Sequence, residues 1–161
     1  MPPDPEIFAL AGQVGERFQR LGQWLAVAES ETGGRLGAAL TDVPGSSKYF
    51  LGGVISYADR VKIEQLQVPE AIIRRHGAVS EETAAAMAGG VRQLLHADVG
   101  VSITGVAGPT AEGSKPVGLT FIGIAAGRIT THRFQWTGDR WDNRRRSVVA
   151  ALELLVQALE H

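Results

Sequence analysis

Serines, a tyrosine and a lysine lie close together in the chain between residues 44 and 62. A serine hydroxyl is a poor nucleophile at its ordinary pKa, so hydrolysis through Ser46 or Ser47 requires a nearby base. A buried lysine can be that base, because desolvation lowers the pKa of its ammonium group. Lys62 is the candidate, and the stretch therefore indicates a serine hydrolase with a lysine base.

Lysine is scarce in this chain, which has three lysines and thirteen arginines. A lysine near serines therefore carries more information than usual, although each candidate also has an ordinary interpretation. Lys62 can be a solvated helix residue, and Ser46 and Ser47 can be turn or capping residues. Tyr57 can pack against a helix, or it can orient the lysine or the nucleophile through its hydroxyl.

Two glycine-containing loops can present backbone N–H groups to an anion. The first, from Ser30 to Gly34, links a strand to a helix, and Ser30, Gly33 and Gly34 are its candidate binding residues. Thr104 and Gly105 follow a later strand and can hold a phosphate or an oxyanion. A histidine base is disfavoured, since no Gly-x-Ser-x-Gly motif is present.

Composition excludes several classes of protein. The chain has 161 residues, of which 44% are hydrophobic and 20% charged, and we expect one soluble domain over 1–161. A net charge of −1 gives no nucleic-acid footprint, and the basic cluster Arg144–Arg146 suits a small anionic ligand. No apolar run is long enough to cross a membrane, so a cytoplasmic protein is expected. Without cysteines, and with four scattered histidines, we expect no metal site.

Hydrophobic spacing predicts helices and strands in alternation. Helices are expected over 7–21, 36–40, from 59, over 80–95 and from 139–142 onward, and strands over 24–29, 49–57, 98–104, 117–125 and 130–136. This order indicates an α/β fold with three layers, α/β/α, and a mixed, mostly parallel sheet of about five strands. Ligands bind at the carboxyl ends of such strands, so the loops at 30–34, 57–62 and 104–109 should converge.

Several separated motifs closely resemble the CinA C-terminal-domain family, and the similarity runs from about residue 8 to residue 158. The segments that carry it are Ala28–Gly34, Thr41–Ser47, Gly52–Val54 with Tyr57, Gly77–Ser80, Thr104–Pro109 and Lys115–Gly118. The enzymatic members of this family are nicotinamide mononucleotide amidases. In fused members a larger N-terminal domain accompanies the module, and this chain resembles the stand-alone form.

The resemblance implies hydrolysis of nicotinamide mononucleotide to nicotinic acid mononucleotide and ammonia, without a metal or an organic cofactor. It implies Ser47 as nucleophile and Lys62 as base, with Tyr57, Thr104 and Arg144 as accessory residues. Ser46, Ser30, Gly33, Gly34 and Gly105 complete the expected substrate-binding set. Arg144 could hold the 5′-phosphate or orient the nucleophile. The only partner expected besides a second copy of the chain in a homo-oligomer is the small nucleotide substrate, with no nucleic acid and no membrane.

One residue departs from the family pattern, because Glu31 stands where cysteine is common. A carboxylate pointing inward would repel a phosphate, so we expect Glu31 to face solvent near a helix N-terminus. Two other functions stay open: a nucleotide-binding module that has lost its chemistry, and a serine amidohydrolase that acts on another small amide.

Overall fold

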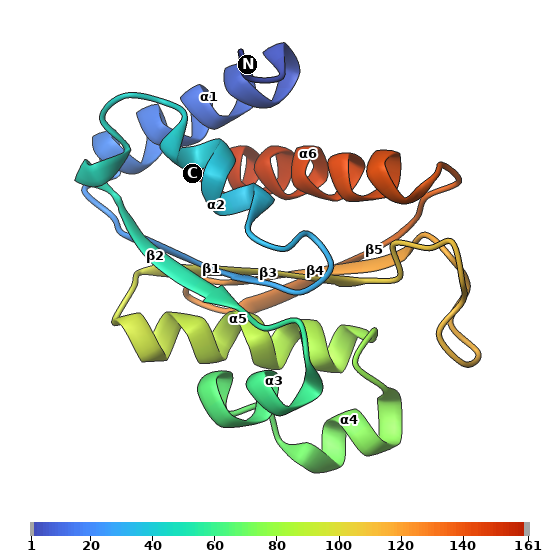
Figure 1. Ribbon diagram of the computed structural model, residues 1–161. Coiled ribbons are helices and arrows are strands. Elements are labelled where there is room, and N and C mark those ends of the chain that lie inside the picture. Colours follow the sequence, from blue (N-terminus) through green and yellow to red (C-terminus); the bar gives the residue numbers. More distant parts are fainter. Residues whose placement is uncertain (1, 160–161) are drawn as a thin grey trace.

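The computed structural model describes residues 2–159, which form a five-stranded sheet between two layers of helices (Figure 1). The strands are β1 (Leu25–Glu29), β2 (Phe50–Ile55), β3 (Val99–Gly105), β4 (Leu119–Ala125) and β5 (Ile129–Gln135). The helices are α1 (Pro5–Leu21), α2 (Arg35–Thr41), α3 (Asp59–Leu66), α4 (Glu70–His76), α5 (Glu81–Leu95) and α6 (Arg140–Ala158), with one 3₁₀ turn, η1 (Ser46–Lys48). The expected three-layer α/β fold is confirmed.

The strands lie in the order β2-β1-β3-β4-β5. β1 pairs in parallel with β2 on one side and with β3 on the other, whereas β4 is antiparallel to both of its neighbours. The chain therefore moves from β1 to its neighbour β2 in one direction across the sheet, and then returns past β1 to β3 in the other direction. Such a reversal opens a crevice at the carboxyl ends of the two diverging strands, here β1 and β3.

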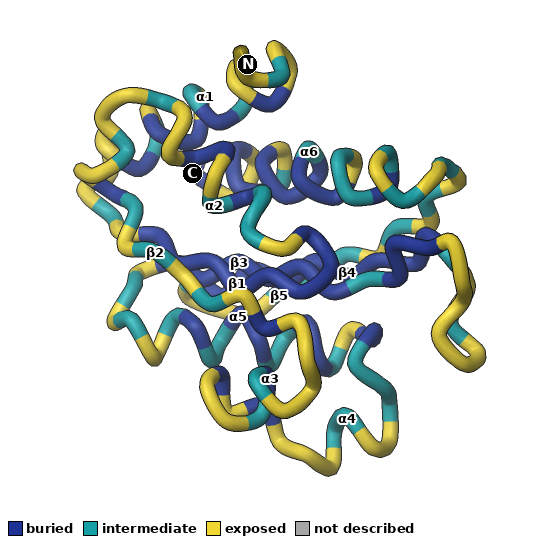
Figure 2. The backbone as a smooth tube through the Cα atoms, in the orientation of Figure 1, coloured by how far each residue is buried: buried dark blue, intermediate teal, exposed yellow. Residues whose placement is uncertain are grey.

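Helices α1, α2 and α6 cover one face of the sheet, and α3, α4 and α5 cover the other (Figure 1). Every residue of β1 and β4 is buried, which explains their nearly continuous apolar sequences. β2 lies at the edge and alternates between exposed and partly buried residues, and Figure 2 shows how the buried residues concentrate in the middle of the sheet. No helix within residues 2–159 is both long and apolar enough to span a bilayer.

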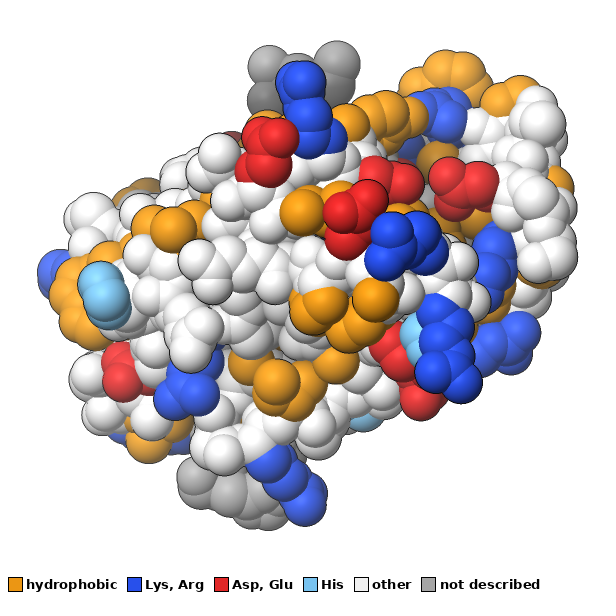
Figure 3. All heavy atoms as spheres, turned by 90° about the horizontal axis from the view of Figure 1, so that it is seen from below, with side chains coloured by type: hydrophobic (Ala, Val, Ile, Leu, Met, Phe, Trp, Pro, Cys, Tyr) orange, Lys and Arg blue, Asp and Glu red, His pale blue; other side chains and the backbone are white. Residues whose placement is uncertain are grey.

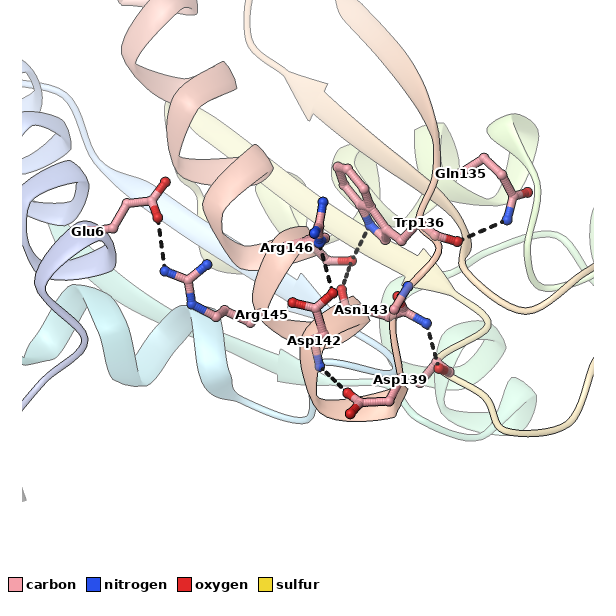
Figure 4. A network of polar contacts seen from close by, with 11 residues as sticks. Glu6, Gln135, Trp136, Asp139, Asp142, Asn143, Arg145 and Arg146 are labelled. Carbon is pink, nitrogen blue, oxygen red and sulfur yellow. Dashed lines mark hydrogen bonds and ion pairs between the residues drawn. The ribbon is translucent and has the colours of Figure 1, made fainter.

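Charged side chains attach the first helix to the last one. The Asp4 carboxylate accepts hydrogen bonds from the N–H groups of Glu6 and Ile7, which begin α1. Arg145 of α6 donates to both Asp4 and Glu6, at 2.7 and 2.9 Å, and the contact with Glu6 is visible in Figure 4. These bonds lower the pKa of Asp4 to about 2, with the Arg145 bond as the largest cause. The two helices therefore pack as a unit on one face of the sheet.

Two short elements were not expected from the sequence. α4 spans seven residues and buries none of them, so it leaves no apolar stripe in the sequence to recognise. η1 places Ser46 and Ser47 in a 3₁₀ turn that precedes β2. The expected strand over 49–57 is shorter than predicted, and Tyr57 lies beyond its end.

Candidate active site

Lys62 lies under the carboxyl ends of β1 and β2 with its ammonium nitrogen next to a serine. Its Nζ is 2.9 Å from the Oγ of Ser30, 2.7 Å from the carbonyl oxygen of Ser56 and 3.1 Å from that of Tyr57. The whole side chain is only 1% exposed. A lysine buried to this degree is unusual. Burial lowers its pKa, whereas the negative charges of Asp59, Glu31 and Glu112 raise it by a smaller amount.

As an ammonium group, Lys62 donates its three N–H groups to the Ser30 hydroxyl and to the two carbonyls, and the loss of one proton leaves a neutral amine in the same place. Two N–H groups can donate to the carbonyls of Ser56 and Tyr57, and the remaining lone pair then faces the Ser30 hydroxyl. In that state the Ser30 O–H donates to the nitrogen. This is the geometry that a lysine base requires in order to take the proton of a serine nucleophile.

The backbone explains why these groups meet. Ser30 is the first residue after β1, and its N–H donates to the carbonyl of Ile103 in β3. Ser56 follows β2 and donates its N–H to the carbonyl of Glu29, at 2.7 Å. Lys62 lies in the first turns of α3, six residues later. Because β1 and β2 are parallel, Ser30 after β1 and Lys62 in the helix after β2 lie at the same end of the sheet, beside the crevice between β1 and β3.

Glu29 fixes the turn that follows the serine. Its buried carboxylate accepts the N–H groups of Leu36 and Gly37, at 2.9 and 3.0 Å, in the first turn of α2. A carboxylate at a helix N-terminus is stabilised by both the free N–H groups and the helix dipole. Gly33 and Gly34, with φ angles of 59° and 102°, let the chain reverse between β1 and α2.

Arg144 binds the same turn from α6. Its Nε donates to the carbonyl of Glu31 at 2.9 Å, and its Nη2 donates to that of Thr32 at 3.3 Å. The guanidinium therefore holds main-chain carbonyls, and it does not line the cavity beside Ser30. Of the two roles that the sequence left open for Arg144, these contacts favour the orientation of the loop that carries Ser30 over a phosphate contact. Gly33 and Gly34 also lie outside the cavity lining.

Ser47 lies at the opposite end of the sheet from Lys62. It belongs to η1, which precedes β2, whereas Lys62 follows that strand. β2 has six residues, so the two side chains are about 20 Å apart. The predicted pairing of Ser47 with Lys62 is corrected by this separation, and Ser46 is removed from the substrate-binding set for the same reason. Ser30, expected only as a binding residue, takes the place beside the lysine.

Thr104 and Tyr57 do line the cavity, but in other ways than expected. The hydroxyl of buried Thr104 donates to the carbonyl of Ala78 at 2.8 Å, so it fixes the segment before α5 against β3. Tyr57 is 62% exposed and contacts Lys62 through its backbone carbonyl, not through its hydroxyl. Gly105 lies at the end of β3 on the cavity wall.

Glu31 does not face solvent. It is 6% exposed, it lines the cavity, and neither of its carboxylate oxygens has a hydrogen-bond partner among the described residues. Burial raises its pKa to about 7, and the backbone N–H groups of Glu31 and Gly105 and the charge of Lys62 oppose that rise. The expectation of an exposed Glu31 is therefore wrong, because the loop held by Arg144 turns this side chain inward.

The cavity at the crevice has a volume of about 210 Å³. It contains the dyad of Ser30 and Lys62, and its remaining charged lining residues are Glu31, Asp59, Glu112 and Arg140. A second hollow of about 380 Å³ shares Asp59 and Glu112 with it and adds Arg75, His76 and Lys115. Figure 3 shows basic side chains gathered beside a histidine on this face of the molecule.

Other parts of the structure offer less. A larger hollow of about 930 Å³ lies against α3, α4 and α5 and contains none of the dyad residues. Within residues 2–159 no group of three or more histidine, aspartate or glutamate side chains is arranged to hold a metal ion. The cavity at Ser30 and Lys62 is therefore the candidate active site.

The sequence pointed to Lys62 but missed the role of Ser30. The available signal was positional, because Ser30 directly follows the first strand of a parallel sheet, at the point where its neighbours diverge. Glu29 gave a second signal, since an acidic residue that ends a buried strand must find buried donors.

Comparison with known proteins gives a consistent result. Residues 7–159 match the family model of the CinA C-terminal domain. A putative competence-damage inducible protein of Halothermothrix orenii is 46% identical over 155 residues, which cover 94% of this chain and 38% of that protein. A CinA-like protein of Thermosynechococcus vestitus is 48% identical, with 93% of this chain and 37% of that protein covered. The chain thus spans less than two fifths of the length of these curated relatives.

Solved structures agree in fold. The crystal structure of a competence/damage inducible protein from Agrobacterium tumefaciens is 35% identical, covers 100% of both chains and has a TM-score of 0.95. A competence-damaged protein superfamily member from Klebsiella pneumoniae 700603 is 32% identical, with a TM-score of 0.93 over 96% of this chain and 98% of that one.

Proposed function

The chain belongs to the CinA C-terminal domain family, and from this premise we propose that it hydrolyses the carboxamide of nicotinamide mononucleotide to nicotinic acid mononucleotide and ammonia. Ser30 is the nucleophile in this proposal, and Lys62 is the base. The observation that carries it is the buried Nζ of Lys62, 2.9 Å from the Ser30 hydroxyl, with its two other neighbours both carbonyl oxygens.

The chemistry follows from the dyad. Neutral Lys62 takes the proton of Ser30 while the serine oxygen bonds to the carboxamide carbon, which gives a tetrahedral intermediate. The lysine ammonium then gives that proton to the amide nitrogen, the C–N bond breaks, and ammonia leaves an ester on Ser30. A water molecule, deprotonated by the same lysine, attacks the ester and releases the acid, and the proton returns to Ser30.

The intermediate carries a negative oxygen that needs hydrogen-bond donors. The N–H group of the residue after a nucleophile often has this role. Among residues 2–159 no main-chain carbonyl accepts the N–H of Glu31, which follows Ser30 directly. This N–H, which also lies close enough to the Glu31 carboxylate to lower its pKa, is the candidate oxyanion donor in place of the Thr104 hydroxyl, which donates to Ala78.

The charge distribution suggests how a nucleotide would lie. The cavity beside Ser30 is too small to enclose a whole mononucleotide, and it continues into the hollow that contains Arg75, His76 and Lys115. Basic side chains of this kind favour a phosphate. Arg75 and His76 lie in the last turn of α4, outside the lining of the cavity that contains Ser30 and Lys62. We place the carboxamide at Ser30 and the 5′-phosphate in this second hollow.

Ammonia release from nicotinamide mononucleotide by the purified protein, without added metal, tests the proposal. Ser30→Ala and Lys62→Ala should each abolish release, whereas Ser47→Ala should keep it within about twofold of the wild-type rate. Circular dichroism and an unfolding curve would show that each variant is folded. Loss of release in Ser47→Ala together with its retention in Ser30→Ala would reject this dyad.

A second function is favoured by the acidic lining of the cavity. Glu31, Asp59 and Glu112 outnumber Lys62 and Arg140, which suits an uncharged or cationic amide better than a phosphorylated one. The protein would then be a serine amidohydrolase for another small amide. A panel of amides with and without phosphate separates the two functions, because both require Ser30 but only the first requires the nucleotide.

A further inference from the structure

Glu31 combines three features that the dyad chemistry does not use. Its side chain is 6% exposed, it lines the same cavity as Ser30 and Lys62, and both of its carboxylate oxygens lack a hydrogen-bond partner within the described residues. Most buried side-chain polar atoms in proteins have at least one hydrogen-bond partner, because an unpaired buried acceptor costs free energy. Such an acceptor inside a ligand cavity indicates a ligand that supplies donors.

The nearby cations are already occupied by other partners. Arg144 donates from Nε and Nη2 to the main-chain carbonyls of Glu31 and Thr32, not to the Glu31 carboxylate. The Nζ of Lys62 is surrounded by Ser30 and two carbonyls. Neither side chain therefore forms an ion pair with Glu31. The backbone N–H groups of Glu31 and Gly105 lie close enough to lower its pKa, but within residues 2–159 they form no hydrogen bond with its carboxylate.

The surroundings are also shaped to admit this side chain. Gly105 ends β3 opposite Glu31, and a Cβ atom built on it would lie 3.0 Å from Oε1 of Glu31. The same Cβ atom would lie 2.6 Å from Oγ1 of Thr120, so a larger residue would crowd both the Thr120 hydroxyl and the carboxylate. The wall of the crevice is thus formed by Glu31 on the β1 side and by bare backbone on the β3 side.

We propose that Glu31 is a specificity-determining residue, whose carboxylate accepts hydrogen bonds from the –NH₂ of the substrate carboxamide and disfavours the carboxylate of the product. The inference rests on the proposed function, and it adds that the enzyme distinguishes the amide from the acid. A carboxamide nitrogen carries two N–H donors, whereas a carboxylate carries none and adds a second negative charge. The binding free energies of the two ligands then differ for two reasons: the amide gains a hydrogen bond to Glu31, and the acid is repelled by its charge.

The experiment measures the affinities of both nucleotides for a protein that cannot turn over. Ser30→Ala is titrated by calorimetry with nicotinamide mononucleotide and with nicotinic acid mononucleotide at pH 8.5, where Glu31 is ionised. The amide should bind at least about tenfold more tightly than the acid, a difference of about 1.4 kcal/mol. In Ser30→Ala with Glu31→Gln the ratio should fall below about threefold, because a glutamine amide can donate to the product carboxylate.

Controls separate this effect from a general loss of structure. Glu64→Gln removes an exposed carboxylate of α3 that does not line the cavity, and it should leave the ratio unchanged. A merely structural role for Glu31 would weaken both ligands equally and leave the ratio intact. Glu31→Ala, which removes the acceptor without adding a donor, should also lower the ratio.

The outcomes distinguish this inference from the proposed function. If the wild-type protein releases ammonia but the amide-to-acid ratio is the same with Glu31→Gln, the inference is overturned and the amidase stands. If no ammonia is released but the ratio depends on Glu31, the amidase is rejected and the recognition by Glu31 stands. If neither nucleotide binds to Ser30→Ala, the inference is overturned, and ammonia release by the wild-type protein still decides the amidase.

Discussion

The proposed chemistry depends on the charge state of one amine, that of Lys62. In the proposed mechanism Lys62 must be neutral to accept the Ser30 proton, and burial lowers its pKa from the ordinary 10.5. The charges of Asp59, Glu31 and Glu112 raise that pKa again. The reactivity of the dyad is therefore a balance between burial, which favours the base, and neighbouring carboxylates, which oppose it.

This balance predicts how activity depends on pH. In the proposed amidase, kcat/KM should rise with pH as Lys62 loses its proton, with a midpoint below 10.5. Glu31→Gln should move the midpoint to lower pH, because it removes a negative charge that favours the ammonium form. Lys62→Arg should lower kcat by about 10²–10⁴-fold at every pH, since a guanidinium does not deprotonate.

Initial rates of ammonia release between pH 6 and 10.5 provide the measurement, with Glu64→Gln as the matched control for a lost carboxylate. A midpoint in Glu31→Gln that stays at the wild-type value would contradict the assigned coupling. An active Lys62→Arg would contradict the assignment of Lys62 as the base.

Individual residues also show what the sequence could and could not predict about the site. Lys62 was identifiable because lysine is rare in this chain and follows a strand. The choice of its partner serine was wrong, because proximity in sequence favoured Ser47, whereas the sheet brings Ser30 to the lysine from 32 residues away. The expectation that Glu31 faces solvent was also wrong. Its exposure depends on the tertiary contacts of its loop, here those made by Arg144, which the local sequence does not contain.

Hydrogen bonds between secondary-structure elements hold Ser30 and the loops beside it in place. β1 ends in a turn that is bound twice, by Glu29 to the first turn of α2 and by Arg144 from α6. The other wall of the crevice is also attached to α6, because Asn143 donates to the carbonyl of Ala107 at 3.0 Å. The start of α6 thus contacts both loops that border the cavity.

Arg144→Ala should consequently act on catalysis through position. Two charge-assisted hydrogen bonds to the Ser30 loop are lost, and a misplaced nucleophile reacts more slowly. We expect kcat to fall on the order of 10–100-fold for both nicotinamide mononucleotide and nicotinamide riboside, which lacks the phosphate. Steady-state kinetics with the two substrates provide the measurement.

The pair of substrates distinguishes positioning from phosphate binding. If Arg144 contacted the phosphate, the variant would raise KM for the mononucleotide alone and leave the riboside unaffected. Arg146→Ala is the control. Arg146 lies two residues after Arg144 in α6, and its exposed ion pair with Asp142 should contribute less than about 1 kcal/mol to the free energy of unfolding.

Elements differ in how well the sequence predicts them. The five strands were found because buried or alternating apolar runs leave a strong pattern, and their order in the chain indicates the mixed sheet. α4 was missed because its seven residues bury nothing, so no periodic stripe marks it. The strand order itself, which creates the crevice, depends on long-range pairing that no local pattern contains.

The whole molecule is a sheet whose centre is apolar and whose carboxyl edge contains buried charges. Glu29, Glu31 and Lys62 are all below about a tenth exposed, and they lie together at one end of the core. Glu29 and Lys62 have hydrogen-bond partners there, whereas the carboxylate of Glu31 has none in the described structure. The protein therefore maintains one buried group at a cost in stability, as is common at functional sites.

That cost depends on pH and can be measured on global unfolding. Burial raises the pKa of Glu31 from 4.5 to about 7 in the folded state, so folding favours the protonated form. The contribution of Glu31 to stability is thus fully present below pH 4.5 and is lost as the pH rises through about 7. Between pH 4 and pH 8.5 the free energy of unfolding of the wild-type protein should fall by about 3 kcal/mol relative to that of Glu31→Gln, because glutamine has no proton to release.

Urea unfolding of both proteins at pH 4 and pH 8.5 gives the free energies. A constant difference from repacking the glutamine cancels when the two pH values are compared, so only the change in the difference matters. Glu64→Gln, whose carboxylate is exposed, should show almost no such change. Were the difference between wild type and Glu31→Gln the same at both pH values, Glu31 would already be paired or solvated in the free protein. A ligand would then not be needed to supply a donor to its carboxylate. The pH dependence of the stability of the whole fold thus tests the recognition by Glu31 that we propose at the candidate active site.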